Sequence, residues 1–424
     1  MATHLKRSLG LLEATLYGVG VIVGAGVYAL IGKAAGLAGN AVWLSFIFGA
    51  FIAAFTGLSY AELASMFPKT GGEYVYAEKA FNRRLAFLVG WLVVVGGVIA
   101  AATISLGFAG YFATLFKTPM IPIAIALVAL LSLINFWGIK ESAVANIIAT
   151  VVEVGGLIAI IVFGMKYVGS INYFEFSHLG LPGVLSGAAL IFFAFLGFED
   201  IVRLSGETKN PTKLIPRALI LSIIISTILY VAVSVIAVSV VGWQALSASS
   251  APLALVAQTA LGQKAFFALS VVALFATFNT VLVTLVATSR MMYGMAEDNG
   301  LPKIFLGVTK KFRTPWFAIL LTAIFSALFV LIGKIEVVAS ITDLALFSTF
   351  AIVNLALIFL RYRAPNMKRY FKVPINVGKF PVLAAIGAVS SVFMLFQFET
   401  KLILVGVALI LAGLAIYELL LKKR

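Results

Sequence analysis

The feature that most limits how this chain can fold is a series of apolar runs, each long enough to cross a lipid bilayer. A membrane helix needs about 20 mostly apolar residues. Charged residues make up only 11% of the chain and hydrophobic ones 62%, too little charged surface for a soluble protein of 424 residues. The runs cover approximately residues 9–33, 40–64, 84–114, 119–138, 143–166, 184–203, 217–241, 264–290, 315–333, 338–361, 381–398 and 402–421. The sequence therefore predicts an all-α membrane protein with twelve transmembrane helices.

The basic residues predict how these helices are oriented. If the N-terminus lies in the cytoplasm and the loops alternate, 25 of the 31 Lys and Arg residues lie on the inner side. The six on the outer side are Lys33, Lys117, Lys166, Lys264, Lys334 and Lys401. Basic residues collect on the cytoplasmic side of membrane proteins. We expect a multi-pass protein of the cell membrane with both termini cytoplasmic. Contact with anionic lipid explains the net charge of +15, and nucleic acid is not expected as a partner.

The remaining composition argues against an enzyme. There is no cysteine, and the two histidines, His4 and His178, lie outside the apolar runs, so we predict no metal site. The longest loops have about 15–25 residues, too few for a soluble catalytic domain. No catalytic residues and no cofactor are predicted.

The first apolar run contains the segment VIVGAGVYA, residues 21–29, in which glycines crowd the middle of a membrane helix. Glycine lets the backbone leave helical dihedrals at little cost, and a broken helix at this depth is tolerated only inside protein or beside a wet cavity. The half-helix that starts at the break offers unpaired N–H groups, which suit a carboxylate. The alternative is close helix packing through small residues.

A second break is expected within residues 184–203, where Gly197, Glu199 and Asp200 interrupt an apolar run. Gly197 lies five spans after Gly24, and an odd number of spans inverts the topology. Discontinuous helices at matching positions of two inverted halves are typical of secondary transporters. We predict a first repeat in residues 1–166, a second in 184–361, and an addition in 381–421. The carbonyls at this break suit an ammonium group, so the two breaks together suit an α-amino acid.

Acidic residues inside the apolar runs are candidates for ion coupling, because they are costly at that depth. Glu153 lies near the middle of its run, and a carboxyl group withdrawn from water favours its neutral form, which suggests a proton carrier. Its alternative role is a structural hydrogen bond to unwound backbone. Glu199 is expected to cap or sense the second break. For Asp200 and Asp343 the alternative is pairing with interfacial bases such as Arg203, and Glu62 is expected at the cytoplasmic interface.

Several motifs resemble those of the amino acid–polyamine–organocation (APC) superfamily. They are Gly24-Ala25-Gly26-Val27-Tyr28, Tyr60-Ala61-Glu62-Leu63, the run from Phe67 to Tyr76, Phe192-Phe193-Ala194-Phe195-Leu196-Gly197-Phe198-Glu199, and Ser289-Arg290 with Tyr293-Gly294. The likeness is to prokaryotic amino acid permeases and to the cationic amino acid transporter branch. It implies a LeuT-type fold with a 5+5 inverted repeat, two extra helices, and discontinuous helices one and six.

The resemblance also implies a substrate site. Ile22, Val23, Gly24, Ala25 and Gly26 would hold the substrate α-carboxylate and part of its amine. The carbonyls of Phe193, Ala194 and Leu196 would hold the α-amino group, and Phe193 would be an aromatic gate. Glu199 matches an acidic site of exchanger relatives. Position 153 departs from the family pattern, because several proton-coupled relatives carry a lysine there. A coupling mechanism that depends on this lysine does not transfer to Glu153.

The expected function is secondary active transport of L-amino acids by alternating access, with proton-coupled symport as the leading mechanism. An amino acid or amine exchanger and sodium-coupled uptake are the alternatives, and transport of a polyamine or organic cation is less favoured. A channel is disfavoured because the sequence shows two isolated breaks and no continuous polar lining. Neither the transported amino acid nor the oligomeric state follows from the sequence.

Overall fold

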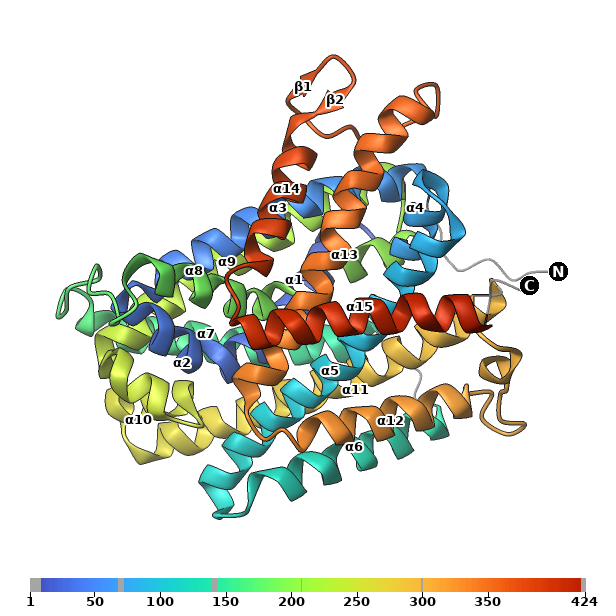
Figure 1. The fold of residues 1–424 in the computed structure, drawn as a ribbon. Coiled ribbons are helices and arrows are strands. Elements are labelled where there is room, and N and C mark those ends of the chain that lie inside the picture. The colour runs from blue at the N-terminus through green and yellow to red at the C-terminus, as the bar shows by residue number, and fades with distance from the viewer. Residues whose placement is uncertain (1–8, 68–71, 139–142, 207, 299, 421–424) are drawn as a thin grey trace.

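The computed structural model describes residues 9–67, 72–138, 143–206, 208–298 and 300–420 (Figure 1). In this part of the chain the structure is helical apart from one short hairpin, in which β1 (Asn376–Val377) pairs antiparallel with β2 (Phe380–Pro381). Nine of the described helical segments are long and apolar enough to cross a membrane, and four further apolar helices are shorter.

Each predicted run corresponds to one helix or to a helix that is interrupted and continues as a further segment. The first comprises α1 (Leu11–Ile22) and α2 (Ala25–Ala38), and the sixth comprises α8 (Gly180–Ile191), η3 (Phe192–Phe195) and η4 (Phe198–Gly206). The others are α3 (Val42–Met66), α5 (Arg83–Phe116), α6 (Met120–Trp137), α7 (Ala143–Gly164), α9 (Pro211–Ala248), α11 (Gln263–Glu297), α12 (Trp316–Val330), α13 (Ile335–Arg363), α14 (Val382–Leu395) and α15 (Thr400–Leu420). Short 3₁₀ turns follow α2 (η1, Gly39–Ala41), α7 (η2, Met165–Tyr167) and α11 (η5, Lys303–Leu306).

Two stretches that the sequence assigned to loops contain helices. The first is α4 (Gly72–Ala80), which is too short and too charged to register as an apolar run but buries Tyr74 and Tyr76. The second is α10 (Pro252–Leu261), a ten-residue helix with proline in its first turn, where the missing N–H costs nothing. Its buried residues face α11, α9 and α7.

Helix α5 lies inside the bundle and packs along α11 and α13, whereas α6 and α12 lie side by side at its edge (Figure 1). The broken helices lie on the other side of α5. There α1 packs against α9 and α7, and α2 packs against α8 and α9. The two interruptions are therefore enclosed by other helices and do not face lipid.

Charged side chains are also buried in this bundle, and one placement corrects the sequence interpretation. Glu62 of α3 is completely buried, not interfacial. Its carboxylate accepts two hydrogen bonds from Arg361, at 2.7 and 2.6 Å, and a third from Val373 N–H at 2.7 Å. Arg369 forms a further ion pair at 3.1 Å. Arg361 lies at the C-terminal end of α13, and Arg369 and Val373 lie in the segment after it. The apolar pattern of the sequence does not predict that these parts of the chain contact α3.

Candidate functional site

The first helix breaks where the glycines predict it. The last regular bond of α1 runs from Val23 N–H to Val19 O at 2.7 Å, and Gly24 then turns the backbone (φ −75°, ψ −145°) before α2 begins. The first amide of α2, Ala25 N–H, donates a long hydrogen bond of 3.3 Å to the Thr280 hydroxyl of α11. The start of α2 therefore presents amides that no helix carbonyl satisfies.

The second break follows α8. The 3₁₀ turn η3 replaces the last α-helical turn, Leu196 is extended (ψ 145°), and Gly197 has a φ of 105°, a conformation that favours glycine. A Cβ atom at Gly197 would also lie 2.5 Å from a side-chain carbon of Val21, so this glycine is needed for contact between the two breaks. The Gly197 N–H donates to Glu199 Oε2 at 3.0 Å, so the Glu199 side chain contacts the second break.

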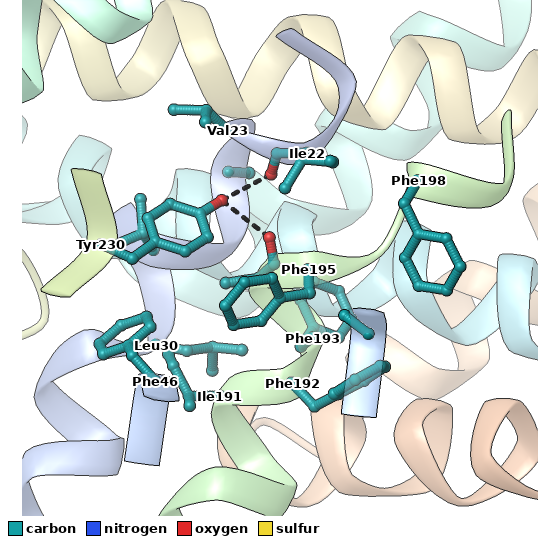
Figure 2. Close-up of a cluster of buried hydrophobic side chains, with 14 of the residues drawn as sticks. Ile22, Val23, Leu30, Phe46, Ile191, Phe192, Phe193, Phe195, Phe198 and Tyr230 are labelled. Atoms are coloured by element: carbon teal, nitrogen blue, oxygen red, sulfur yellow. Dashed lines mark hydrogen bonds between the residues drawn. The ribbon is translucent and has the colours of Figure 1, made fainter. Parts of the chain in front are cut away.

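A tyrosine that the sequence analysis did not single out connects the two breaks. The hydroxyl of Tyr230 in α9 lies 2.6 Å from Ile22 O and 2.7 Å from Ala194 O, as the dashed lines in Figure 2 show. A hydroxyl has one hydrogen, so it donates to one of these carbonyls at a time. Gly26 is in equally close contact with the other break, because its Cβ would lie 2.6 Å from Ala194 Cα. Glycine therefore serves close packing here as well as helix interruption.

Both breaks border one cavity of about 150 Å³. Of the predicted site residues, the lining includes Ile22, Gly24, Ala25, Gly26, Phe193, Leu196 and Glu199. Val23 and Ala194 are buried outside the lining, although the Ala194 carbonyl faces Tyr230. The remaining walls come from α5, α11 and Leu346 of α13.

The described lining of the cavity extends from the breaks toward one end of the bundle. It follows α1 back to Gly20, η4 to Asp200, α5 back to Val93 and α11 on to Met291. On the opposite side Phe193 is 5% exposed, and Phe192 and Phe195 pack in a buried aromatic cluster beside it (Figure 2). The site is thus closed on the aromatic side.

The α11 wall carries three threonines whose hydroxyl hydrogens are already used. Thr280, Thr284 and Thr288 donate to the carbonyls four residues earlier, at 2.8, 2.7 and 2.7 Å. These groups can still accept a hydrogen bond but have no hydrogen to donate to a ligand. No lysine, arginine or histidine belongs to the described lining, so its side chains are apolar, neutral polar or acidic.

Glu153 lies behind this wall. Its side chain is 1% exposed and hydrogen-bonds to Asn279, which does line the cavity. Its second carboxylate oxygen, Oε1, has no partner among the described residues, and its peptide carbonyl accepts a 2.6 Å hydrogen bond from Tyr28. The Asn279 side chain thus connects this carboxyl group to the cavity.

The other membrane-depth acids differ in position. Asp200 borders the cavity, and the side chain of Arg203, its suggested partner, lies outside the described residues. Asp343 of α13 is completely buried, and its carboxylate lies beside the Phe193 backbone of η3 and interacts with it. No described base forms an ion pair with Asp343, in contrast to the suggested pairing.

Comparison with known proteins supplies the context for this site. The family model for amino acid permeases matches residues 9–417. The branched-chain amino acid permease BcaP of Bacillus subtilis is 31% identical over 444 residues, covering 99% of this chain and 94% of the relative. The methylthioribose transporter of the same organism is 29% identical, with 90% and 87% covered. Cationic amino acid transporter 4 of Mus musculus is 28% identical, with 86% and 61% covered.

Proposed function

Because this chain belongs to the amino acid permease family of the APC superfamily, we propose that it carries L-amino acids across the cell membrane by alternating access. Membership of this family makes the chain a multi-pass membrane transporter and not an enzyme. The observation that carries the more specific proposal is the pair of helix breaks that meet at one cavity. Backbone N–H groups from one break and carbonyl groups from the other match the two charges of an α-amino acid.

The fold we propose has twelve transmembrane helices of the LeuT type. Helices α1 to α7 within residues 1–166 form one repeat, and α14 and α15 within 381–421 are additional. Helices α8 to α13, which cover the predicted range 184–361, form the inverted second repeat. In support, the interruptions occur in the first helix of each half. The excess of basic residues on one side supports an orientation with both termini in the cytoplasm, so that the cavity extends inward.

In the proposed complex, the backbone from Ile22 to Gly26 binds the substrate carboxylate. The carbonyls of Phe193, Ala194 and Leu196 accept hydrogen bonds from the ammonium group, and the Phe193 ring closes the site on the outer side. The hydrogen bond from Tyr230 does not exclude the Ala194 carbonyl from this role, because a carbonyl oxygen has two lone pairs.

A neutral amino acid with an apolar side chain fits this cavity best. The wall away from the breaks includes Val93, Ala100, Ile104, Val283 and Leu346, and its threonine hydroxyls have no free hydrogen. The branched-chain specificity in the name of one relative agrees with this class. A cationic side chain is the second candidate, because Glu199 and Asp200 border the same cavity.

For the coupling step we propose that Glu153 takes up and releases a proton. Support comes from its burial, its unpartnered Oε1 and its hydrogen bond to the cavity residue Asn279. Loss of the proton would leave a charge in an apolar region, which favours the next conformational step. Glu199 is a second candidate, and exchange or sodium coupling are the competing mechanisms.

The test is uptake of L-leucine into proteoliposomes under an inward proton gradient, with sodium present or replaced. We expect saturable uptake, no competition by D-leucine, no sodium requirement, and counterflow by preloaded L-leucine. Absence of counterflow for every L-amino acid tested would contradict the proposed function. A sodium requirement would retain amino acid transport but reject proton coupling.

Glu153→Gln tests the coupling residue within the same assay. Glutamine keeps the shape and the hydrogen bond to Asn279 but cannot exchange a proton. We expect counterflow to stay within about twofold of the wild type, while gradient-driven accumulation falls at least about tenfold, the equivalent of about 1.4 kcal/mol. Undiminished accumulation by Glu153→Gln rejects this role.

A further inference from the structure

Six glycines border the cavity, and one of them differs from the rest. A Cβ atom at the other five would lie within 3.0 Å of a neighbouring heavy atom, so their missing side chains are explained by close packing. These five are Gly20, Gly24, Gly26, Gly97 and Gly197. At Gly96 the nearest atoms would be the side chains of Leu346 and Ala345, at 3.7 and 3.8 Å. Those are ordinary van der Waals distances, and a methyl group would fit.

Nothing in the backbone explains this glycine either. Gly96 lies in the interior of α5, a 34-residue helix, and does not have a positive φ. In a helix interior, glycine is less favourable than alanine by about 0.5–1 kcal/mol. Small residues let membrane helices approach closely, but the distances to α13 show no such approach at this position. What the missing side chain does provide is space in the cavity.

From these distances we infer that Gly96 sets the size of the compartment for the substrate side chain. This inference rests on the proposed function. If the two breaks hold the carboxylate and the ammonium group, the side chain of the substrate must point away from them, toward α5 and α13. Gly96, Ala100 and Leu346 form that part of the lining. A larger residue at position 96 therefore occupies space that a branched substrate needs.

The experiment compares transport of L-leucine with that of L-alanine by Gly96→Ala and Gly96→Val in proteoliposomes. The measured quantity is the ratio of the two kcat/KM values. A misfit of one methylene in an apolar pocket changes discrimination by about 10–200-fold. We expect Gly96→Val to lower the leucine-to-alanine ratio at least about tenfold. Gly96→Ala should lower it less, and L-alanine transport should be retained.

Two other glycines serve as controls. Gly155 of α7 lies outside this cavity, and a Cβ there would meet nothing within 4 Å, so Gly155→Ala should leave the ratio and both rates unchanged. Gly97 is the neighbour of Gly96, but its Cβ would lie 2.2 Å from the Thr288 hydroxyl. We expect Gly97→Ala to reduce transport of both amino acids together, which is the signature of disturbed packing.

The outcomes separate this inference from the proposed function. If Gly96→Val transports leucine and alanine in the wild-type ratio, or loses both equally as Gly97→Ala does, Gly96 does not set substrate size. Should Gly96→Val fail to fold, Gly96→Ala decides, because its methyl group fits without a clash. A wild-type protein that transports no L-amino acid overturns the proposed function, and the present inference with it.

Discussion

At the scale of single residues, the Tyr230 hydroxyl connects the two breaks. Its ring is completely buried and packs edge-on to Phe195 and tilted against Phe46. The two carbonyls that it meets, Ile22 O and Ala194 O, lie in the last residue of α1 and in the 3₁₀ turn η3. Repulsion between two carbonyl dipoles that face one another is relieved when a donor lies between them. Tyr230 is thus a positioning residue that holds the backbone of the site.

Tyr230→Phe removes this donor and keeps the ring. Leaving buried acceptors unsatisfied costs about 1–3 kcal/mol. We expect a lower midpoint of thermal unfolding in detergent and weaker substrate binding, with the unfolding midpoint partly restored by saturating L-leucine. Tyr167→Phe is the control, because among the described residues its hydroxyl makes one long, exposed contact of 3.5 Å with Thr259 O. Equal midpoints for Tyr230→Phe and the wild type would show that the hydroxyl does not hold the breaks together.

At the scale of elements, the ion cluster around Glu62 joins α3 to the end of α13 and to the segment that follows it. Arg369 also donates to the Leu360 and Ala364 carbonyls at 2.9 and 3.0 Å, so it caps the last turn of α13. Burial lowers the pKa of the Arg369 guanidinium, and the Glu62 carboxylate opposes that shift. The cluster therefore holds three parts of the chain together through one carboxylate.

Glu62→Gln tests the stability of this connection. The substitution leaves the Arg361 guanidinium buried without its counter-charge, and breaking a buried pair costs about 3–5 kcal/mol. We expect a large fall in the thermal unfolding midpoint and in the yield of monodisperse protein. The matched control is Glu418→Gln, which breaks the exposed pair of Arg84 and Glu418 (3.3 Å) and should cost about 0–1 kcal/mol. Comparable losses in the two variants would contradict the structural role of the cluster.

At the scale of the whole molecule, the distribution of charge predicts which end of the bundle faces the cytoplasm. The chain has no cysteine, so single cysteines can be introduced without removing native ones. We expect Lys264→Cys and Lys334→Cys to react with a membrane-impermeant maleimide on intact cells. Lys303→Cys and Lys310→Cys should react only after permeabilisation. The reverse pattern would invert the proposed orientation and place the cavity opening outside.

The helix breaks and the apolar runs were predictable because their causes are local. Gly24, Gly26 and Gly197 weaken a helix wherever it lies, and a run of about 20 apolar residues suits a bilayer in any fold. The helices α4 and α10 were missed because one is charged and the other has only ten residues. Both are stabilised by residues distant in sequence, which the local pattern does not contain.

By itself, the sequence determined that this is a polytopic helical membrane protein, where its helices lie, and where two of them break, because hydrophobic length and glycine content act on nearest neighbours. Only the tertiary structure decided what surrounds the breaks. Tyr230 lies 208 residues from Ile22, and Arg361 lies 299 residues from Glu62. The space left by Gly96 likewise depends on its distance to α13. Such contacts depend on how helices pack against each other, and packing is a property of the whole bundle.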